Sequence, residues 1–339
     1  MLSKKFWFYL KTANVYLHYK LKRYIPFIVI ITPTRRCNLK CEYCRDWKDK
    51  NRQDIKISKL YSLVDEIDKL AIPFISFTGG EPLLIKNIED VAAYASRKNI
   101  IVNLNTNGTL IDRKRADKIA KSFDFIRLSL DGLEKVHDKI SGIKGTYKKV
   151  IEALEYLTSV PNKTAKIGIN YVLNKDNRKN LKKFNEIFKD KVDFISFIPE
   201  FSFCHHYKHR LNVTKEVIDN YKYLESVKKS GNTRDFIKKF DLDYSRNICD
   251  AGKLYLIIMS RGNIYACPFL PEKDYLNFRL GSIYKNSLYD ILKNKQNIKF
   301  SNFCYGCHTI CTTEISRIFR MSPFELLKNF FYLKKIYLF

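Results

Sequence analysis

Short runs of β-branched and aromatic residues alternate with amphipathic stretches between Pro26 and Pro199, and this alternation constrains the fold more than any other feature of the sequence. The apolar residues of the amphipathic stretches recur every three or four positions, which predicts helices. Repeated strand and helix units predict a parallel sheet, and six of them make an α/β fold whose sheet curves into a partial, TIM-like (β/α)6 barrel. The strands are expected at residues 27–32, 74–78, 101–105, 125–130, 166–173 and 193–198.

The pattern changes after the sixth strand. Residues 201–248 are polar with helical periodicity, and we interpret them as a helical linker. From Cys249 onward two strand-like runs enclose an Arg-Gly-Asn turn, which is typical of a β-hairpin. These features divide the chain into a basic, aromatic helical extension at 1–25, the barrel at 26–200, the linker at 201–248, a small α+β domain at 249–312 and an amphipathic C-terminal helix at 313–339.

The composition excludes a disordered chain and favours an anionic partner. Hydrophobic residues make up 45% of the 339 residues and aromatic residues 14%, which is enough apolar surface for a core. The 62 Lys and Arg exceed the 35 Asp and Glu, and the net charge of +27 suits nucleic acid, a membrane surface or an acidic peptide. A general compositional bias toward Lys explains this charge equally well. Because neither a secretory signal nor a membrane-spanning run is evident, we expect a cytoplasmic protein, at most peripheral to a membrane.

The first expected strand runs into a loop with three cysteines, Cys37, Cys41 and Cys44, at the spacing C-x3-C-x2-C. Short spacings in a reducing compartment favour metal ligation over disulfides. Three thiolates can bind three irons of a [4Fe–4S] cluster and leave the fourth iron open to another ligand. A chance motif or a zinc loop is the alternative, although zinc would require a fourth ligand nearby.

Polar turns follow the next three expected strands, at residues 79–82, 105–108 and 129–132. The carboxyl ends of parallel strands meet at one edge of a sheet, so these turns should share a rim with the cysteine loop. Gly79 and Gly80 can let the backbone approach a ligand closely, and the carboxylate of Glu81 can accept from an ammonium group. The simpler interpretation of the Asn-Gly and Asp-Gly pairs is that they are only turns and helix caps.

The cysteine loop, with Tyr43 before its last cysteine, and the Gly-Gly-Glu-Pro turn resemble the defining motifs of the radical S-adenosylmethionine superfamily. This resemblance implies a [4Fe–4S] cluster whose open iron binds the amino and carboxylate groups of S-adenosylmethionine. It implies that an electron from the cluster cleaves the sulfonium to a 5′-deoxyadenosyl radical, which abstracts a hydrogen atom from the substrate. The residues that it places at the cofactor are Tyr43, Gly79, Gly80, Glu81, Pro82, Thr106, Asn107, Ser129 and Asp131.

A second cysteine set comprises Cys249, Cys267, Cys304, Cys307 and Cys311. It resembles the auxiliary-cluster extension called the SPASM or twitch domain, which implies a second, auxiliary [4Fe–4S] cluster. A complete SPASM region has seven cysteines, so five favour the shorter twitch form. The resemblance assigns the first four as ligands, with Cys311 as a substitute for Cys304 or Cys307. A structural zinc site is the alternative, because CxxC pairs serve both metals.

Cys204, His205 and His206 directly follow the sixth expected strand. A segment in that position should hang over the mouth of the barrel. There it could bind substrate, transfer a proton or, through Cys204, quench a radical, and these three residues are our candidates for the catalytic groups. The alternative is a solvated linker without a chemical role.

The resemblance predicts a radical enzyme of the oxidoreductase or transferase type, with a reductant such as flavodoxin or ferredoxin as a partner. Three substrate classes compete, and we favour a peptide or protein side chain over a small alcohol or sugar and over a lipid-linked molecule at the membrane. The sequence shows no winged-helix leader-binding domain before the barrel, which counts against leader-dependent peptide enzymes. The first 36 residues hold eight Lys or Arg and no acidic residue, and the C-terminal stretch is similarly basic and aromatic. Both stretches could lie on an anionic membrane surface, which would favour a lipid-linked substrate, or they could instead pack against the barrel.

A hypothesis from another class is a nucleic-acid-binding protein whose cysteines hold structural metals. In that case the +27 charge would contact phosphates. This hypothesis predicts salt-sensitive binding and no cleavage of S-adenosylmethionine, and the set of motifs makes nucleic acid the less favoured partner.

Overall fold

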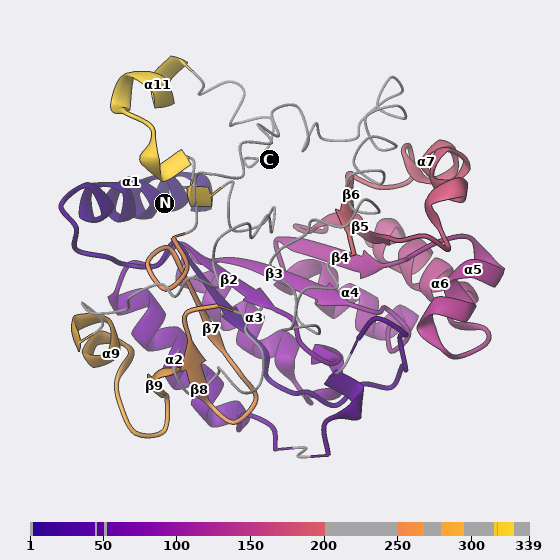
Figure 1. Cartoon of the computed structure of the whole chain (residues 1–339), viewed down its shortest axis with the longest axis horizontal. Helices are drawn as coiled ribbons and strands as arrows, with labels where there is room; N and C mark the ends of the chain where they lie inside the picture. Colours follow the sequence, from indigo (N-terminus) through magenta and orange to yellow (C-terminus); the bar gives the residue numbers. More distant parts are fainter. Residues whose placement is uncertain are drawn as a thin grey trace.

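A single sheet of nine strands organises the chain in the computed structural model, which describes residues 3–44, 46–50, 53–200, 250–267, 279–294, 315–316 and 318–328. The strand order is β6-β5-β4-β3-β2-β1-β7-β8-β9, and all neighbours from β6 to β7 are parallel (Figure 1). This confirms the predicted α/β fold with a partial barrel. The six barrel strands end within one residue of their expected bounds, at Ile28–Ile31, Phe74–Phe77, Ile101–Thr106, Phe125–Ser129, Lys166–Leu173 and Phe194–Pro199 for β1 to β6.

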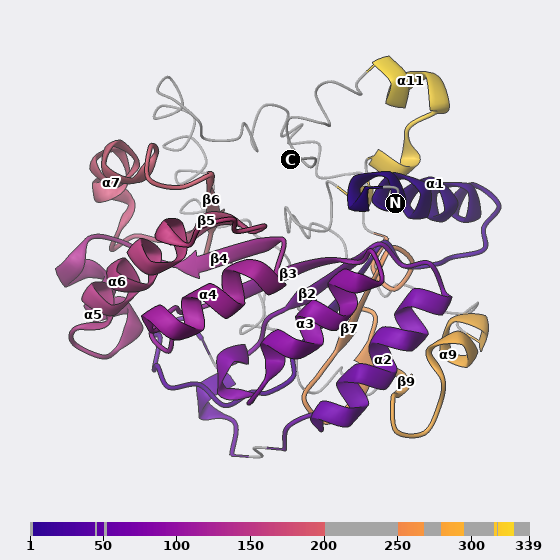
Figure 2. The same cartoon turned by 180° about the vertical axis from the view of Figure 1, so that it is seen from behind.

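The main barrel helices cover one face of this sheet (Figure 2). They are α2 (Ile57–Lys69), α3 (Ile88–Arg97), α4 (Arg113–Ser122), α6 (Thr146–Ser159) and α7 (Leu181–Phe188). Helix α5 (Glu134–Ser141) was not predicted from the sequence, because two of its three buried residues are polar and leave no apolar periodicity. Short 3-10 turns lie at Asp46–Lys48, Pro82–Leu84 and Arg178–Asn180 for η1, η2 and η3.

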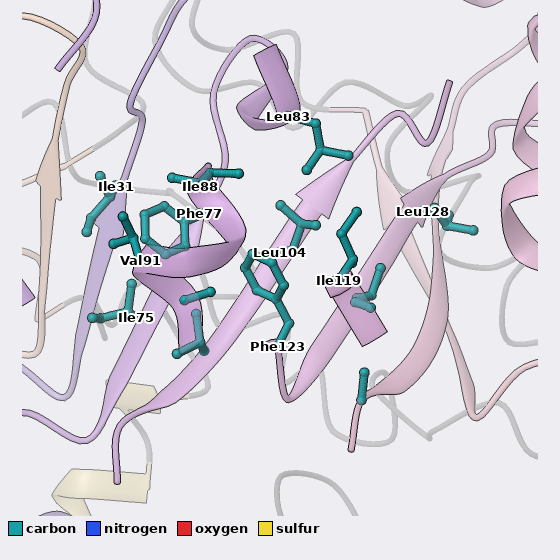
Figure 3. Close-up of a cluster of buried hydrophobic side chains, with 14 of the residues drawn as sticks. Ile31, Ile75, Phe77, Leu83, Ile88, Val91, Leu104, Ile119, Phe123 and Leu128 are labelled. Carbon is teal, nitrogen blue, oxygen red and sulfur yellow. The ribbon is translucent and has the colours of Figure 1, made fainter. Parts of the chain in front are cut away.

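The hydrophobic core lies between these helices and the sheet (Figure 3). Alternate strand residues such as Ile75, Phe77 and Leu104 meet Val91 of α3 and Ile119 of α4, and all five side chains are fully buried. Each such side chain stabilises the fold by about 1.5–3 kcal/mol relative to exposure. The intervening strand residues therefore face the opposite, concave side of the sheet.

The C-terminal strands continue the same sheet. β7 (Tyr255–Ile258) pairs in parallel with β1, and β8 (Asn263–Tyr265) and β9 (Arg279–Ser282) follow antiparallel. All four β7 residues are buried, as expected for an interior strand with an unbroken apolar run. Gly262 takes a positive φ of 74° in the expected hairpin turn, and α9 (Leu288–Asn294) packs beside α2. The expected hairpin is thus present, joined to the barrel by backbone hydrogen bonds.

Helix α1 (Lys4–Lys20) lies against the amino ends of the barrel strands. Its Phe8 packs with the first residues of β3, β4 and β6. Lys4 Nζ binds a carboxylate oxygen of Asp124 at 2.6 Å, immediately before β4, and Lys11 Nζ binds Asp68 Oδ1 at 2.9 Å. The helix closes the end of the barrel opposite to the carboxyl rim.

Residues near the C-terminus pack against the C-terminal half of α1, on the face that carries Val15. Tyr16 Oη donates to the carbonyl oxygen of Met321 at 2.7 Å, and Tyr19 Oη and Arg320 Nε each bind Asp250 Oδ2 at 3.0 Å. The short helix α11 (Pro323–Lys328) follows (Figure 1). The expected linker at 201–248 lies outside the described residues, and the expected C-terminal helix is described only in part. No helix in the described ranges has the length and apolar character to cross a membrane.

Candidate functional site

The loop after β1 brings the thiols of Cys37, Cys41 and Cys44 close enough to influence one another. Burial raises the pKa of all three, that of Cys44 to about 11, with Asp46 adding to the effect. Metal ligation requires thiolates, and buried thiolates without a cation are unfavourable, so the loop suits a bound iron cluster.

The three thiols do not form a single-ion site. Within the described ranges no three His, Cys, Asp or Glu side chains are arranged to hold one metal ion. A [4Fe–4S] cluster binds each thiolate to a different iron, so its ligands stand further apart than those of a single ion. The donor set and its spacing along one loop fit the cluster better than zinc.

The backbone of the cysteine loop is held by the end of α5. Lys40 N donates to the carbonyl oxygen of Ser141 and Glu42 N to that of Ile140, both at 3.0 Å. A Cβ at Gly142 would lie 2.8 Å from the carbonyl oxygen of Lys40, so only glycine fits there, at a positive φ of 73°. Helix α5 therefore positions the cysteine loop.

Gly79 and Gly80 pack against the segment that leads to Cys37. A Cβ at Gly79 would overlap Thr32, and one at Gly80 would overlap the carbonyl oxygen of Arg36. Gly80 N and Glu81 N also donate to that segment, to the carbonyl oxygens of Thr34 at 3.0 Å and Arg36 at 2.8 Å. The expectation that these glycines make room for a ligand stays a prediction. The packing is a separate structural reason for glycine at both positions.

The carboxylate of Glu81 is fully buried between the ends of β2 and β3. Its Oε1 accepts from Thr106 Oγ1 at 2.7 Å and Leu83 N at 3.0 Å, and its Oε2 accepts from Asn107 N at 2.8 Å. Burial raises the pKa of Glu81, while these three bonds oppose the rise. A carboxylate offers about four acceptor positions, so one position on Oε2 is left for a further donor such as an ammonium group.

Asn107 connects this turn to the cysteine loop. Its Nδ2 donates to Asn38 Oδ1 at 2.9 Å and lies 3.8 Å from Cys37 Sγ. Its Oδ1 accepts from the backbone and hydroxyl of Thr109 at 3.0 and 2.7 Å, which fixes the orientation of the amide. The amide N–H groups therefore face the sulfur side of the loop.

Asp131, at the end of β4, connects the loop to β5. Tyr43 Oη donates to Asp131 Oδ2 and Val172 N donates to Asp131 Oδ1, both at 2.7 Å. Burial raises the pKa of Asp131 to about 6, although both bonds oppose the rise. Ser129 pairs with Asn170 of β5 and is partly exposed at the same rim.

The structure thus joins Cys37, Glu81, Thr106 and Asn107 through hydrogen bonds, and Tyr43 to Asp131. Pro82 begins η2 and is buried beneath this rim. Of the second cysteine set only Cys267 is described, partly buried against the cluster of Leu254, Tyr255 and Phe319. The other predicted site residues lie outside the described ranges, namely Cys204, His205, His206, Cys249, Cys304, Cys307 and Cys311.

A row of polar side chains on the concave face was not singled out from the sequence. Asn103 Nδ2 donates to Ser76 Oγ at 2.8 Å, and Arg127 bridges Asn103 Oδ1 at 3.1 Å and Ser196 Oγ at 2.9 Å. Asn170 Nδ2 donates to Asn105 Oδ1 at 3.1 Å, and Asn170 Oδ1 is buried without a hydrogen-bond partner in the described structure. The available signal was the polar residues at alternate positions of otherwise apolar strands.

Comparison with known proteins agrees with this fold and site. The family model of the radical SAM superfamily matches residues 31–186, and that of the SPASM iron–sulfur cluster-binding domain matches residues 249–313. The chain belongs to the radical SAM superfamily. This superfamily uses a [4Fe–4S] cluster and S-adenosylmethionine, and the SPASM model describes an iron–sulfur cluster-binding domain, so both cofactor expectations from the sequence are confirmed at the level of the family.

The relatives differ in how much of this chain they resemble. The Fe-coproporphyrin III synthase of Methanosarcina barkeri is 34% identical over half of the chain, and the alignment spans only 43% of that synthase. An uncharacterised protein of Methanocaldococcus jannaschii is 30% identical over 71% of the chain and 85% of its own length. Streptococcus suis SuiB, solved bound to its precursor peptide SuiA, has a similar fold with a TM-score of 0.63 at 18% identity, over 94% of this chain and 77% of SuiB.

Proposed function

We propose that this enzyme cleaves S-adenosylmethionine reductively and uses the resulting radical to modify a peptide or protein side chain. The observation that carries the proposal is the hydrogen-bonded rim, where the cysteine loop, the buried Glu81 carboxylate and the Asn107 turn meet at the ends of adjacent strands. Buried carboxylates are rarely left without a cation, and the ammonium group of S-adenosylmethionine would supply one.

In this proposal Cys37, Cys41 and Cys44 hold the cluster. When bound, the cluster supplies the electron that splits the sulfonium of S-adenosylmethionine into methionine and a 5′-deoxyadenosyl radical. The amide of Asn107 stabilises the negative sulfur of Cys37, because N–H groups favour the charged form of a thiolate.

The remaining rim residues orient the cofactor. Glu81 accepts from the methionine ammonium through the open position of Oε2, and Thr106 and Asn107 fix the carboxylate by their hydrogen bonds to it. Tyr43 and Asp131 hold the loop against β4, and Ser129 offers a hydroxyl at the same rim.

The concave face supports a peptide as the substrate. Peptide groups present an N–H donor beside a C=O acceptor, and Asn170 Oδ1 on this face is an acceptor without a hydrogen-bond partner in the described structure. SuiB, which has a similar fold, was solved bound to its precursor peptide, and this supports the proposal of a peptide. In the same proposal the SPASM domain binds substrate or accepts the electron left after the radical step, and Cys204, His205 and His206 remain the catalytic candidates.

A small carboxylate-bearing substrate is a second candidate. Arg127 lies on the concave face with its guanidinium 4.5 Å from the ring of Phe194, and a stacked guanidinium suits recognition of a carboxylate. The Methanosarcina relative is named as a synthase of Fe-coproporphyrin III, a compound with carboxylate side chains. Loss of substrate turnover in Arg127→Gln, with basal cleavage of S-adenosylmethionine intact, would favour this class.

The deciding experiment is anaerobic reconstitution with iron and sulfide, followed by reduction in the presence of S-adenosylmethionine. We expect 5′-deoxyadenosine from the intact enzyme and none from Cys41→Ala, with reduced flavodoxin or ferredoxin able to replace dithionite. Deuterium appearing in 5′-deoxyadenosine from a deuterated peptide, but not from deuterated sugars or lipids, would support the peptide class. No 5′-deoxyadenosine from the reconstituted enzyme would contradict the proposal.

A further inference from the structure

Helix α1 presents an apolar stripe on its outer face. Phe6, Leu10, Leu17 and the following Leu21 are 45%, 49%, 57% and 57% exposed. At 100° per residue these positions, with exposed Ala13, fall within about 80° of the helix circumference. Large hydrophobic side chains on one line of a helix form a contact surface rather than scattered exposure.

The opposite face of α1 is fixed to the barrel. Phe8 and Val15 are buried, and Lys4 and Lys11 point inward to Asp124 and to Asp68. Two inward ion pairs and two buried apolar anchors prevent the helix from rolling its stripe into the protein. The stripe is therefore held outward by the fold.

Basic side chains gather at the C-terminal end of the stripe, where Glu325 of α11 is an acidic neighbour of Lys20. Lys20, Lys22 and Arg23 are exposed at the end of α1, and the first acidic residue of the chain is Glu42. Two copies meeting through this face would bring like charges together in a chain that already carries +27. An anionic bilayer instead accepts the apolar side chains and neutralises the basic ones.

We propose that α1 binds an anionic membrane surface, with Phe6, Leu10, Leu17 and Leu21 inserted at the boundary between headgroups and acyl chains. The proposal concerns a surface, and it stands whichever substrate the enzyme modifies.

The position of α1 also sets the orientation on the membrane. The helix covers the amino ends of the strands, whereas the cysteine loop lies at their carboxyl ends. A bilayer on α1 therefore leaves the mouth of the barrel facing the aqueous side. In this orientation the radical site faces a soluble peptide, or the part of a lipid-linked substrate that extends well out of the bilayer.

The test is cosedimentation of the reconstituted full chain with vesicles of phosphatidylcholine alone or mixed with phosphatidylglycerol. We expect binding to the anionic vesicles only, and release at about 1 M salt as the charges are screened. The triple variant Leu10→Ser, Leu17→Ser, Leu21→Ser should bind the anionic vesicles at least about tenfold more weakly. Its 5′-deoxyadenosine production should match that of the wild type, because these side chains point away from the barrel.

A matched control removes exposed aromatic side chains elsewhere. Tyr284→Ser and Tyr289→Ser change residues that are 45% and 60% exposed near α9, and this pair should leave vesicle binding unchanged. Equal binding by the wild type and the triple variant would overturn the proposal, as would equal binding to neutral vesicles. A dimer that the triple variant dissociates, without vesicle binding by the wild type, would assign the stripe to a second copy instead.

Discussion

The hydroxyl of Tyr43 donates to Asp131 Oδ2 at 2.7 Å and ties the cysteine loop to the end of β4 across 88 positions of sequence. The other oxygen of Asp131 accepts from Val172 N, and the backbone N of Asp131 donates to His137 Nδ1 at 3.1 Å. Asp131 therefore connects the loop and β5 through its carboxylate, and α5 through its backbone N–H. This connection makes the loop geometry depend on residues that do not themselves bind iron.

Replacing Tyr43 by Phe should loosen the loop while leaving the fold intact. The variant loses a hydrogen bond to a carboxylate, which is worth about 1.5–3 kcal/mol, and leaves Asp131 Oδ2 without its donor. We expect faster loss of iron to a chelator and slower formation of 5′-deoxyadenosine. Iron release kinetics and single-turnover assays measure the two effects.

Tyr94→Phe is the matched control, because Tyr94 Oη donates to Asp65 Oδ1 at 2.6 Å between α2 and α3, away from the loop. It should leave iron retention and 5′-deoxyadenosine formation unchanged. If both variants released iron at the wild-type rate, the bond between Tyr43 and Asp131 would have no role in holding the loop.

Replacing Glu81 by Gln should weaken binding of S-adenosylmethionine and destabilise the rim. One oxygen becomes an NH2 group that faces an existing donor, and a buried unsatisfied group costs about 1–3 kcal/mol. Removal of the charge also removes the partner proposed for the methionine ammonium. Equilibrium dialysis with labelled cofactor and urea unfolding measure the two effects separately.

Glu89→Gln provides the comparison, because Glu89 is also buried but pairs with Arg115 on the helical side of the barrel. This variant should be destabilised without a change in cofactor affinity. Wild-type cofactor affinity in Glu81→Gln would show that Glu81 only joins β2 to β3.

Replacing Gly80 by Ala should displace the segment before Cys37, because the added Cβ would overlap the backbone of Arg36. We expect loss of bound iron in Gly80→Ala. Gly145→Ala is the control, since Gly145 has a positive φ of 84° but no atom within 4 Å of an added Cβ. That variant should cost about 1 kcal/mol through backbone strain and retain the cluster, as iron analysis and urea unfolding would show.

Elements with a clear periodicity were predictable from the sequence. The barrel strands either alternate apolar and polar residues or are continuously apolar. Strand β5, for example, is found at Lys166–Leu173, the range expected for it. The short α5 was missed, because two of its three buried residues, His137 and Ser141, are polar. The hairpin at residues 255–265 was recognised, but its pairing with β1 follows from burial on both faces of β7, which local pattern does not report.

The site was predictable as a set of turns on one rim, since strand order places those turns together. The hydrogen-bond partners of each side chain were not predictable from the sequence. Glu81 bonds to Thr106 and Asn107 across 25 and 26 positions, and the space at Gly80 is set by the carbonyl oxygen of Arg36. Such contacts depend on the register and curvature of the sheet, which the periodicity of a strand does not determine.

The buried His137 should make the stability of the protein depend on pH. Burial lowers the pKa of this imidazole from 6.5 to about 4, opposed by the nearby Asp138. Its Nδ1 accepts from Asp131 N, so protonation would also place a donor against a donor. The unfolded chain therefore binds more protons than the folded one below pH 6.5, and the contribution of His137 to stability falls by up to about 3 kcal/mol as the pH drops from 6.5 to 4.

Asp131 has the opposite effect, because its raised pKa of about 6 makes the folded protein gain stability as the pH falls through the same window. The measurable quantity is therefore the difference between wild type and His137→Asn, whose Oδ1 can still accept from Asp131 N. Urea unfolding at pH 7.5, 6.0 and 5.0 should show the variant losing less stability than the wild type on acidification. Parallel pH profiles would mean that His137 is not neutral and buried in solution.

The iron content distinguishes the two halves of the chain. If the C-terminal cysteines hold one auxiliary cluster beside that of Cys37, Cys41 and Cys44, the reconstituted enzyme should contain about eight iron and eight sulfide per chain. Cys267→Ala should reduce both to about four, because Cys267 is an expected auxiliary ligand, and 5′-deoxyadenosine should still form at the first cluster. Cys41→Ala should abolish 5′-deoxyadenosine while retaining the auxiliary iron.

About four iron in the wild type with one equivalent of zinc would assign the C-terminal cysteines to a structural zinc site, and the auxiliary cluster would then have no part in the reaction.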